Sequence, residues 1–264
     1  MDSSSSSGPE GSSPIQELST TLEASTAATS VQQRRCLVIS LIRHAQCVSN
    51  ATKAWNEDDD PDPLTEVGRF QAESLGKEWA NTRIDYLMSS PLERAHDTAK
   101  ALSDHNETHP EVHTLSLLVE RQYGRRVPQL MRYNQRAGRE ELTGRSAYSF
   151  GVVLEGAVLR GEIVIRSVLQ TRGVISEPPE FFTNKKTTTT PAVLPDGIPH
   201  VVIVSHNVFL SELYEKLHYW GGDYKETKCD YRNAGWSRHI LWYDENSDEL
   251  DVFDMKFCAE RWGQ

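Results

Sequence analysis

The chain contains few cysteines and no long apolar run, and each absence narrows the class of protein. Its four cysteines, Cys36, Cys47, Cys229 and Cys258, form no CxxC pair. We therefore expect reduced, mostly structural thiols, as in a cytoplasmic or nuclear protein. No apolar stretch approaches the roughly 18 residues that a membrane-spanning helix needs. This absence predicts a soluble protein with no membrane partner.

Several catalytic motifs are also missing. No cysteine is followed six residues later by an arginine, which excludes the loop of a cysteine-dependent phosphatase. The chain has no GxSxG, no GxGxxG and no GxxxxGKS or GxxxxGKT. The usual signatures of a serine hydrolase, a dinucleotide-binding domain and a nucleotide-binding P-loop are therefore absent.

Residues 1–33 lack lysine, arginine and almost all large apolar side chains. They hold ten serines and four acidic residues. Such a segment cannot bury enough surface to offset its ordering entropy, so we expect a disordered tail. It also lacks the basic start and apolar centre of a secretory signal, and the arginines of a mitochondrial presequence. This interpretation leaves residues 34–264 as the single folded domain.

The charge balance argues against a nucleic-acid partner, because the formal net charge is −10 and nucleic-acid binders carry a basic footprint. Two local clusters depart from the average. The acidic run at residues 57–62 is interpreted as a solvated loop. Six arginines between Arg121 and Arg139 form either an ion-paired, solvated face or a surface for an anionic substrate tail.

The apolar pattern predicts alternating strands and helices. Thr65 is the expected N-cap of one helix, and a long loop is expected at residues 177–199. Further helices are predicted near residues 92–102, near 155–172 and after His206. The expected strands are 36–42, 84–88, 112–119, 201–204, 238–243 and 250–257. This order predicts an α/β fold, a three-layer αβα sandwich with a mainly parallel central sheet.

Polar side chains follow three of the expected strands. Arg43 and His44 end the first, Ser89 and Ser90 precede Arg94, and Ser205 precedes His206. Ligands bind beyond the carboxyl ends of parallel strands, so neighbouring strands would bring two imidazoles and two guanidiniums into one crevice. Two arginines and a protonated histidine can balance a phosphoryl group without a metal. A neutral imidazole among them could attack phosphorus.

Four segments together resemble the histidine phosphatase superfamily, the phosphoglycerate-mutase-like proteins. The alanine after the first histidine, Ala45, resembles members of the fungal and plant type. "RHAQCVSN" resembles the Arg-His-Gly-Glu/Gln signature, and "DPLTEVGRFQA" resembles the Pro-Leu-Thr-x-x-Gly-x-x-Gln-Ala helix start. "SSPLERAHDTA" and "VIVSHNVFL" resemble the family's Ser-Pro-Leu-x-Arg-Ala and Val-Ser-His-Gly-x-Phe-Leu segments. All four occur in the family's order, although residues 126–198 carry little of the resemblance.

The resemblance implies a role for each matching residue. His44 would be the phosphorylated nucleophile and Glu120, in "LLVERQYGRR", the proton donor. A purely structural role for Glu120, paired with Arg121 or Arg125, stays open. Asn233, in "YRNAGWSRHILW", would be structural. The implied phosphate ligands are Arg43, Arg94 and His206, with Asn50 close to the phosphate.

Two positions depart from the family pattern. Ala45 and Asn207 stand where the family has glycine after each histidine. Asn207 would place a polar side chain at the rim of the phosphate pocket, which makes it a candidate substrate contact. Because asparagine tolerates left-handed backbone geometry, we expect the turn to survive.

His105, His109 and His113 are spaced by four residues, which on a helix would align them as candidate metal ligands. Pro110 interrupts such a helix, and HNETH lacks the glutamate that HExxH requires. We therefore expect no metal and no cofactor.

Together these observations predict a metal-independent phosphatase that hydrolyses a phosphomonoester through a phosphohistidine on His44. Sugar phosphate, inositol phosphate, nucleotide and phosphoprotein stay open as substrates. One alternative is a non-catalytic phospho-ligand binder or scaffold that retains the pocket. Another is a phosphoglycerate-type mutase, although such mutases are longer around the signature.

Overall fold

The computed structural model describes residues 34–53, 61–120, 145–221 and 229–256, with side chains in 145–158 excluded. The predicted disordered tail (1–33) and the arginine cluster at 121–139 lie outside the described residues. Of the acidic run at 57–62, residues 61 and 62 are described.

Strands from the whole described chain join in one sheet. They are β1 (Arg34–Arg43), β2 (Tyr86–Ser89), β3 (Val112–Thr114), β4 (Val174–Ile175), β5 (His200–Ser205), β6 (Trp236–Asp244) and β7 (Glu249–Lys256). The strand order is β3-β2-β5-β1-β6-β7, and β4 pairs with β1. The run from β3 to β1 is parallel, whereas β4 and β6 are antiparallel to β1 and β7 is antiparallel to β6.

The parallel register brings the three predicted polar strand ends together. Arg43 at the end of β1 pairs with Ser205 at the end of β5, and Ser89 at the end of β2 pairs with Val204. The carboxyl ends of β1, β5 and β2 therefore meet at one edge of the sheet, as the sequence predicts.

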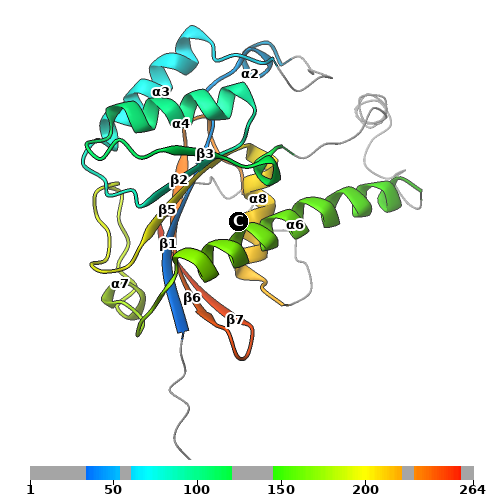
Figure 1. Cartoon of the computed structure of the whole chain (residues 1–264). Coiled ribbons are helices and arrows are strands. Elements are labelled where there is room, and N and C mark those ends of the chain that lie inside the picture. Colours follow the sequence, from blue (N-terminus) through cyan, green and yellow to red (C-terminus); the bar gives the residue numbers. More distant parts are fainter. Residues whose placement is uncertain (1–33, 54–60, 121–144, 222–228, 257–264) are drawn as a thin grey trace, which may run out of the picture. The chain divides into compact units, whose positions relative to one another are not determined.

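Helices cover both faces of this sheet, which confirms the expected αβα layers (Figure 1). Around residues 46–120 they are α2 (Val48–Thr52), α3 (Glu66–Glu78), α4 (Glu93–His105) and the 3₁₀ turn η1 (Ser116–Leu118). Later in the chain they are α6 (Arg145–Arg172), α7 (Glu180–Thr183) and α8 (Asn207–His218). Helices α3 and α4 pack on one face, and α6 and α8 pack on the other.

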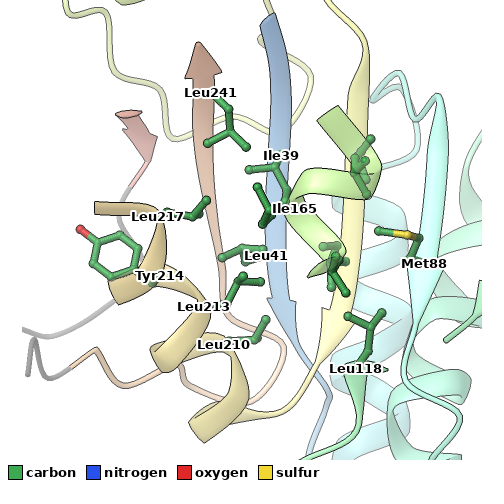
Figure 2. Close-up of a cluster of buried hydrophobic side chains, with 14 of the residues drawn as sticks. Ile39, Leu41, Met88, Leu118, Ile165, Leu210, Leu213, Tyr214, Leu217 and Leu241 are labelled. Carbon is green, nitrogen blue, oxygen red and sulfur yellow. The ribbon is translucent and has the colours of Figure 1, made fainter. Parts of the chain in front are cut away.

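Side chains from β1 enter both layers, because successive residues of a strand point to opposite faces. Ile39 and Leu41 pack among Ile165 of α6 and Leu213 of α8 (Figure 2). Ile42 instead joins the α3–α4 layer. Fully burying one such aliphatic side chain stabilises the fold by roughly 2 kcal/mol, so β1 is anchored from both sides.

Helix α3 packs directly on the loop that follows β1. The Thr65 hydroxyl accepts a hydrogen bond from the Gly68 N–H at 3.0 Å, which confirms Thr65 as the N-cap. A Cβ at position 68 would lie 1.9 Å from the carbonyl oxygen of Gln46. Glycine is therefore required here for the close approach that supports the loop after His44.

Three predicted elements need correction. The strand expected over 112–119 ends at Thr114 and gives way to η1, where the Leu118 carbonyl accepts a bond from the Ser205 hydroxyl at 2.7 Å instead of a sheet bond. The helix expected from about 155 begins at Arg145. The loop at 177–199 contains the short helix α7.

The described helices and cysteines bear on the expectations of no membrane-spanning helix and of structural thiols. None of the helices described there has both the length and the apolar character needed to cross a membrane. Cys36, Cys47 and Cys229 are free and buried, consistent with structural thiols. Cys258 lies outside the described part of the chain.

Candidate active site

His44 lies at the exit of β1, where hydrogen bonds hold its backbone from three directions. Its N–H donates to the carbonyl of Ser205 at 2.9 Å. Its own carbonyl accepts bonds from the Ala234 N–H at 3.2 Å and from the Asn233 amide at 3.1 Å. The side chain is 3% exposed, so its position is set by the surrounding fold.

One ring nitrogen of His44 is committed to the backbone. Nδ1 lies 2.7 Å from the carbonyl oxygen of Ala45, and a carbonyl can only accept, so Nδ1 carries the proton. The lone pair of the neutral ring is then on Nε2. Burial, with Arg43 and Arg94 nearby, lowers the pKa of His44 to about 3. Its nucleophilic, neutral form is therefore the stable one at neutral pH.

Arg43 reaches from the same strand end toward the segment before β6. Its Nη1 donates to the carbonyl of Tyr231 at 2.5 Å. Its buried Nε has no hydrogen-bond partner in the part of the chain that the structure describes. Burial lowers the pKa of Arg43, while Asp230 and Glu120 act in the opposite direction. Arg43 thus supplies a fixed positive charge with a donor available for an anion.

Arg94 comes from the start of α4 and is 5% exposed. Its Nη1 lies 3.8 Å from a carboxylate oxygen of Asp62. Asp62 also accepts from the Ser49 N–H at 3.0 Å and from the Ser49 hydroxyl at 2.6 Å. Burial acts to raise the pKa of Asp62, but the Ser49 hydrogen bonds outweigh it and the pKa is lowered. Asp62 is therefore a buried anion beside Arg94, and its interpretation as part of a solvated loop is wrong.

His206 follows β5 and lies beside His44, with ring centroids 5.1 Å apart. Its Nε2 is 2.8 Å from the Ser90 hydroxyl. Its Nδ1 is buried without a hydrogen-bond partner among the described residues. Burial, His44 and Arg94 lower the pKa of His206 well below its usual value. Burial therefore disfavours the protonated ring in this structure, and a positive charge on His206 toward phosphate stays a prediction, whereas Arg43 and Arg94 supply guanidinium charges.

Asn50 and Asn233 lie behind the nucleophile. The Asn233 amide donates both to Asn50 Oδ1 at 2.8 Å and to the His44 carbonyl at 3.1 Å. Asn50 therefore connects α2 to the loop that carries His44. The structural role expected for Asn233 agrees with these contacts, and a phosphate contact by Asn50 stays a prediction.

Asn207 is the first residue of α8, so the left-handed geometry considered for it is not used. Its amide donates to a carboxylate oxygen of Asp230 at 2.6 Å, and its carbonyl oxygen accepts from the Tyr231 N–H at 2.7 Å. Both ends of the side chain are thus engaged with residues 230 and 231. A substrate contact stays a prediction, but the observed contacts position the segment that binds Arg43.

Glu120 lies just after η1 and reaches the start of α8. Its Oε1 accepts from the Phe209 N–H at 3.0 Å, an amide that has no acceptor within the helix because it belongs to the first turn. Its charge also acts on Arg43 and Arg160. The geometry places a carboxylate near the site, while Arg121 and Arg125, its alternative partners, lie outside the described residues.

Several contributors were missed or undervalued by sequence reasoning. Thr98 accepts from the Ala45 N–H at 3.0 Å and donates to the Arg94 carbonyl of its own helix at 2.7 Å, so it links α4, which carries Arg94, to the loop after His44. Ser90 contacts His206, and Asp62 contacts Arg94. Tyr231 acts through its backbone carbonyl, which no sequence signal could reveal. For Asp62, the sequence signal was its position directly before Pro63 in the helix-start motif.

The histidines considered for a metal do not converge. His105 ends α4, His109 is in a turn with φ of 43°, and His113 stacks on Tyr86 in the neighbouring strand, with centroids 4.3 Å apart. Within the described ranges they form no group of potential metal ligands.

The site thus combines an imidazole with one directed lone pair, two buried guanidiniums and a nearby carboxylate at the carboxyl ends of parallel strands. These features define an α/β protein with a candidate histidine nucleophile and a candidate anion site. Residues 39–155 match the model of the histidine phosphatase superfamily (branch 1). This stretch, which is less than half of the chain, is thus similar to that superfamily. The predictions of this family and of a phosphatase- or mutase-like enzyme class are confirmed at that level.

Curated relatives match a shorter part of the chain. Fructose-2,6-bisphosphatase TIGAR from Xenopus tropicalis is 31% identical over 88 residues, which are 33% of this chain and 32% of the relative. The protein of the same name from Xenopus laevis gives the same identity and coverage. The match thus spans about a third of the length of these curated relatives.

Solved structures share the fold over most of the chain. Phosphoglycerate mutase from Bacillus anthracis superposes with a TM-score of 0.56 at 16% identity, covering 84% of this chain and 94% of that one. A mycobacterial glucosyl-3-phosphoglycerate phosphatase, solved with VO3, gives a TM-score of 0.53 at 20% identity, covering 83% and 98%. At these identities the likeness establishes the histidine-phosphatase fold.

Proposed function

We propose that the protein is a metal-independent phosphatase that hydrolyses a phosphomonoester through a phosphohistidine on His44. The carrying observation is the bond between His44 Nδ1 and the Ala45 carbonyl. It leaves the lone pair of Nε2 beside Arg43, Arg94 and His206. The lowered pKa of His44, to about 3, supports the same role, because only the neutral ring is a nucleophile.

The reaction proceeds in two displacements. Nε2 of His44 attacks phosphorus, the bond to the ester oxygen breaks, and Glu120 gives its proton to that oxygen. Arg43 and Arg94 balance the charge on the phosphoryl oxygens. Water then attacks the phosphohistidine while the Glu120 carboxylate accepts its proton. Phosphate leaves, and His44 and Glu120 return to their starting states.

A buried donor supports phosphate as the ligand. Arg43 Nε has no hydrogen-bond partner in the described residues, and an unpaired buried donor costs about 1–3 kcal/mol. A phosphoryl oxygen would supply the missing acceptor. We infer a small phosphorylated metabolite as substrate, with a phosphoprotein as the alternative that a panel of phosphorylated compounds separates.

The competing function is a phospho-ligand binder or scaffold without turnover. The observation that favours it is the departure from glycine at Asn207. The contacts of Asn207 with Asp230 and Tyr231 weaken this argument, because the side chain is engaged away from the nucleophile. A phosphoglycerate-type mutase differs in outcome: it would return the phosphoryl group to the substrate rather than to water.

The first prediction tests the covalent step. Wild-type protein incubated with ³²P-labelled substrate and quenched in alkali should retain label on His44 as an acid-labile bond. His44→Ala should lose the label, and turnover should fall by at least about 10³-fold. His206→Ala, which keeps the nucleophile, should still acquire label slowly. Near wild-type turnover by His44→Ala would refute the mechanism, and phosphate binding without label in the wild type would establish the binder.

A second prediction concerns metal removal. Because arginines and imidazoles supply the phosphate-binding groups, hydrolysis of nitrophenyl phosphate should be unchanged by EDTA. Vanadate should inhibit by adopting the trigonal-bipyramidal geometry of the displacement. Loss of activity in EDTA with recovery on adding magnesium or zinc would contradict a metal-independent mechanism.

A further inference from the structure

Two histidines and one aspartate converge away from the phosphate site. His239 of β6 and Asp254 of β7 are cross-strand partners, and His218 is in the last turn of α8. Asp254 Oδ1 lies 2.6 Å from Nδ1 of His239 and 3.0 Å from Nε2 of His218. All three candidate ligand atoms lie within 4.8 Å of one another. Two imidazoles are thus directed at the same carboxylate oxygen.

The outward-facing atoms of this cluster already have partners. Nε2 of His239 is 2.7 Å from the Ser237 hydroxyl, and the other carboxylate oxygen of Asp254 accepts from the Tyr214 hydroxyl at 2.9 Å. Histidine and carboxylate ligands of a metal commonly have such outer partners, which fix the ring tautomer and the orientation of each ligand. Ser237 and Tyr214 therefore leave one inward ligand atom on His239 and one on Asp254.

The cluster can be reached from solvent. Strand β7 is at the edge of the sheet, and the side chains of His218 and Asp254 are 27% and 26% exposed. His239 is fully buried at the base. This combination of one buried and two partly exposed ligands leaves an open side on which a water molecule could complete a coordination shell.

We propose that His218, His239 and Asp254 form a zinc site, with two imidazole nitrogens, one carboxylate oxygen and a water as ligands. Zinc takes nitrogen and carboxylate ligands at roughly 2.0–2.2 Å in a tetrahedral arrangement. The ligand atoms would then be roughly 3.3 Å apart, so the two nitrogen–oxygen separations need to widen by less than about 1 Å. The site is separate from the phosphate pocket, since His239 pairs with Ile39 of β1, four residues before Arg43.

The alternative to zinc is that ring N–H protons of the two histidines hold the cluster together. Without zinc, Asp254 can accept a hydrogen bond from each imidazole, and the cluster is then a structural link between α8, β6 and β7. The two cases differ in a measurable way, because only the zinc site binds a divalent ion with a defined stoichiometry. Zinc joining these elements should also raise the melting temperature of the full chain.

Titration of the metal-stripped full-length chain tests the proposal. Calorimetry should give one zinc per chain, and cobalt should give the visible absorption of a tetrahedral nitrogen–oxygen site without thiolate charge-transfer bands. His218→Ala and Asp254→Asn should each weaken zinc binding by at least about 100-fold. His105→Ala is the matched control, because His105 also lies in the last turn of a helix, and its affinity should be unchanged.

We expect His218→Ala to fold, since it removes a side chain that is only partly buried. Its melting temperature without metal checks this. In the wild type and control, zinc should raise the melting temperature, and in His218→Ala it should not. Absence of stoichiometric binding would overturn the zinc site. Equal affinity in His218→Ala, or a cobalt spectrum with thiolate bands, would place the metal elsewhere and overturn it too.

Discussion

At the scale of single residues, Glu120 combines two contacts that complicate its proposed role. It accepts from the Phe209 N–H at the start of α8, and its charge acts on Arg43. A substitution that removes the carboxyl group would disturb the helix start as well as the chemistry. Glutamine keeps an acceptor oxygen for Phe209 but cannot donate a carboxylic proton, so it separates the two roles.

Glu120→Gln should therefore leave the melting temperature nearly unchanged and slow the hydrolysis of alkyl phosphates by about 10²–10⁴-fold. Nitrophenyl phosphate should be affected far less, because its leaving group needs little protonation. Steady-state rates on the two substrates give the comparison, with the exposed Glu107→Gln as control. Equal losses on both substrates would show that Glu120 is a structural residue.

At the scale of elements, the start of α8 and the segment before β6 are joined beside the phosphate pocket. Asn207 bonds Asp230 and the Tyr231 N–H, and the Tyr231 carbonyl accepts from Arg43. Ser211, one turn along α8, donates to the carbonyl of Cys229. Helix α8 thus positions residues 229–231 before β6, and this segment in turn positions Arg43.

Asn207→Gly restores the family's glycine but removes both hydrogen bonds. We expect it to destabilise the fold by about 2 kcal/mol and to lower kcat/KM, because Arg43 loses a fixed acceptor. Chemical denaturation and kinetics on nitrophenyl phosphate measure the two effects. Asn81→Gly, in an exposed turn after α3, is the control and should change neither. Higher activity in Asn207→Gly would mean that the asparagine obstructs the pocket.

At the scale of the whole molecule, the fold buries several histidines in their neutral form. Burial is the main cause that lowers the pKa of His44 to about 3 and of His200 and His206 well below the usual value. In the unfolded chain each would titrate near 6.5. Below that pH the unfolded state binds more protons than the folded state, so stability must fall as the pH falls.

Between pH 7.5 and pH 5, each of these histidines should lower the free energy of unfolding by up to about 2 kcal/mol. The melting temperature should drop by at least about 5 °C. Carboxylates with lowered pKa, such as Asp62, contribute only below about pH 4, so the histidine window is distinct. Replacing His44 with Asn should reduce the slope in this window. A melting temperature constant from pH 7.5 to pH 5 would contradict neutral burial.

The sequence predicted the parts of this molecule that depend on local pattern. Apolar runs indicated β1, β2 and β5, Thr65 marked the start of α3, and the polar strand ends indicated the crevice. It predicted α6 as too short a helix. It also predicted η1 as strand, because a contact that helps to decide η1 is distant in the chain. The bond from Ser205 to the Leu118 carbonyl comes from a segment 87 residues away in the chain.

By itself, the sequence determined the resemblance to a family, the αβα layers and the residues that meet at the strand ends, since motif order and periodicity are properties of the chain. Only the tertiary structure decided which atoms of those residues act. It placed the His44 proton on Nδ1 and Asp62 beside Arg94, and it buried Arg238 against the rings of Trp79 and Trp236. These choices depend on backbone carbonyls, burial and cross-strand register, which arise only when distant segments pack together.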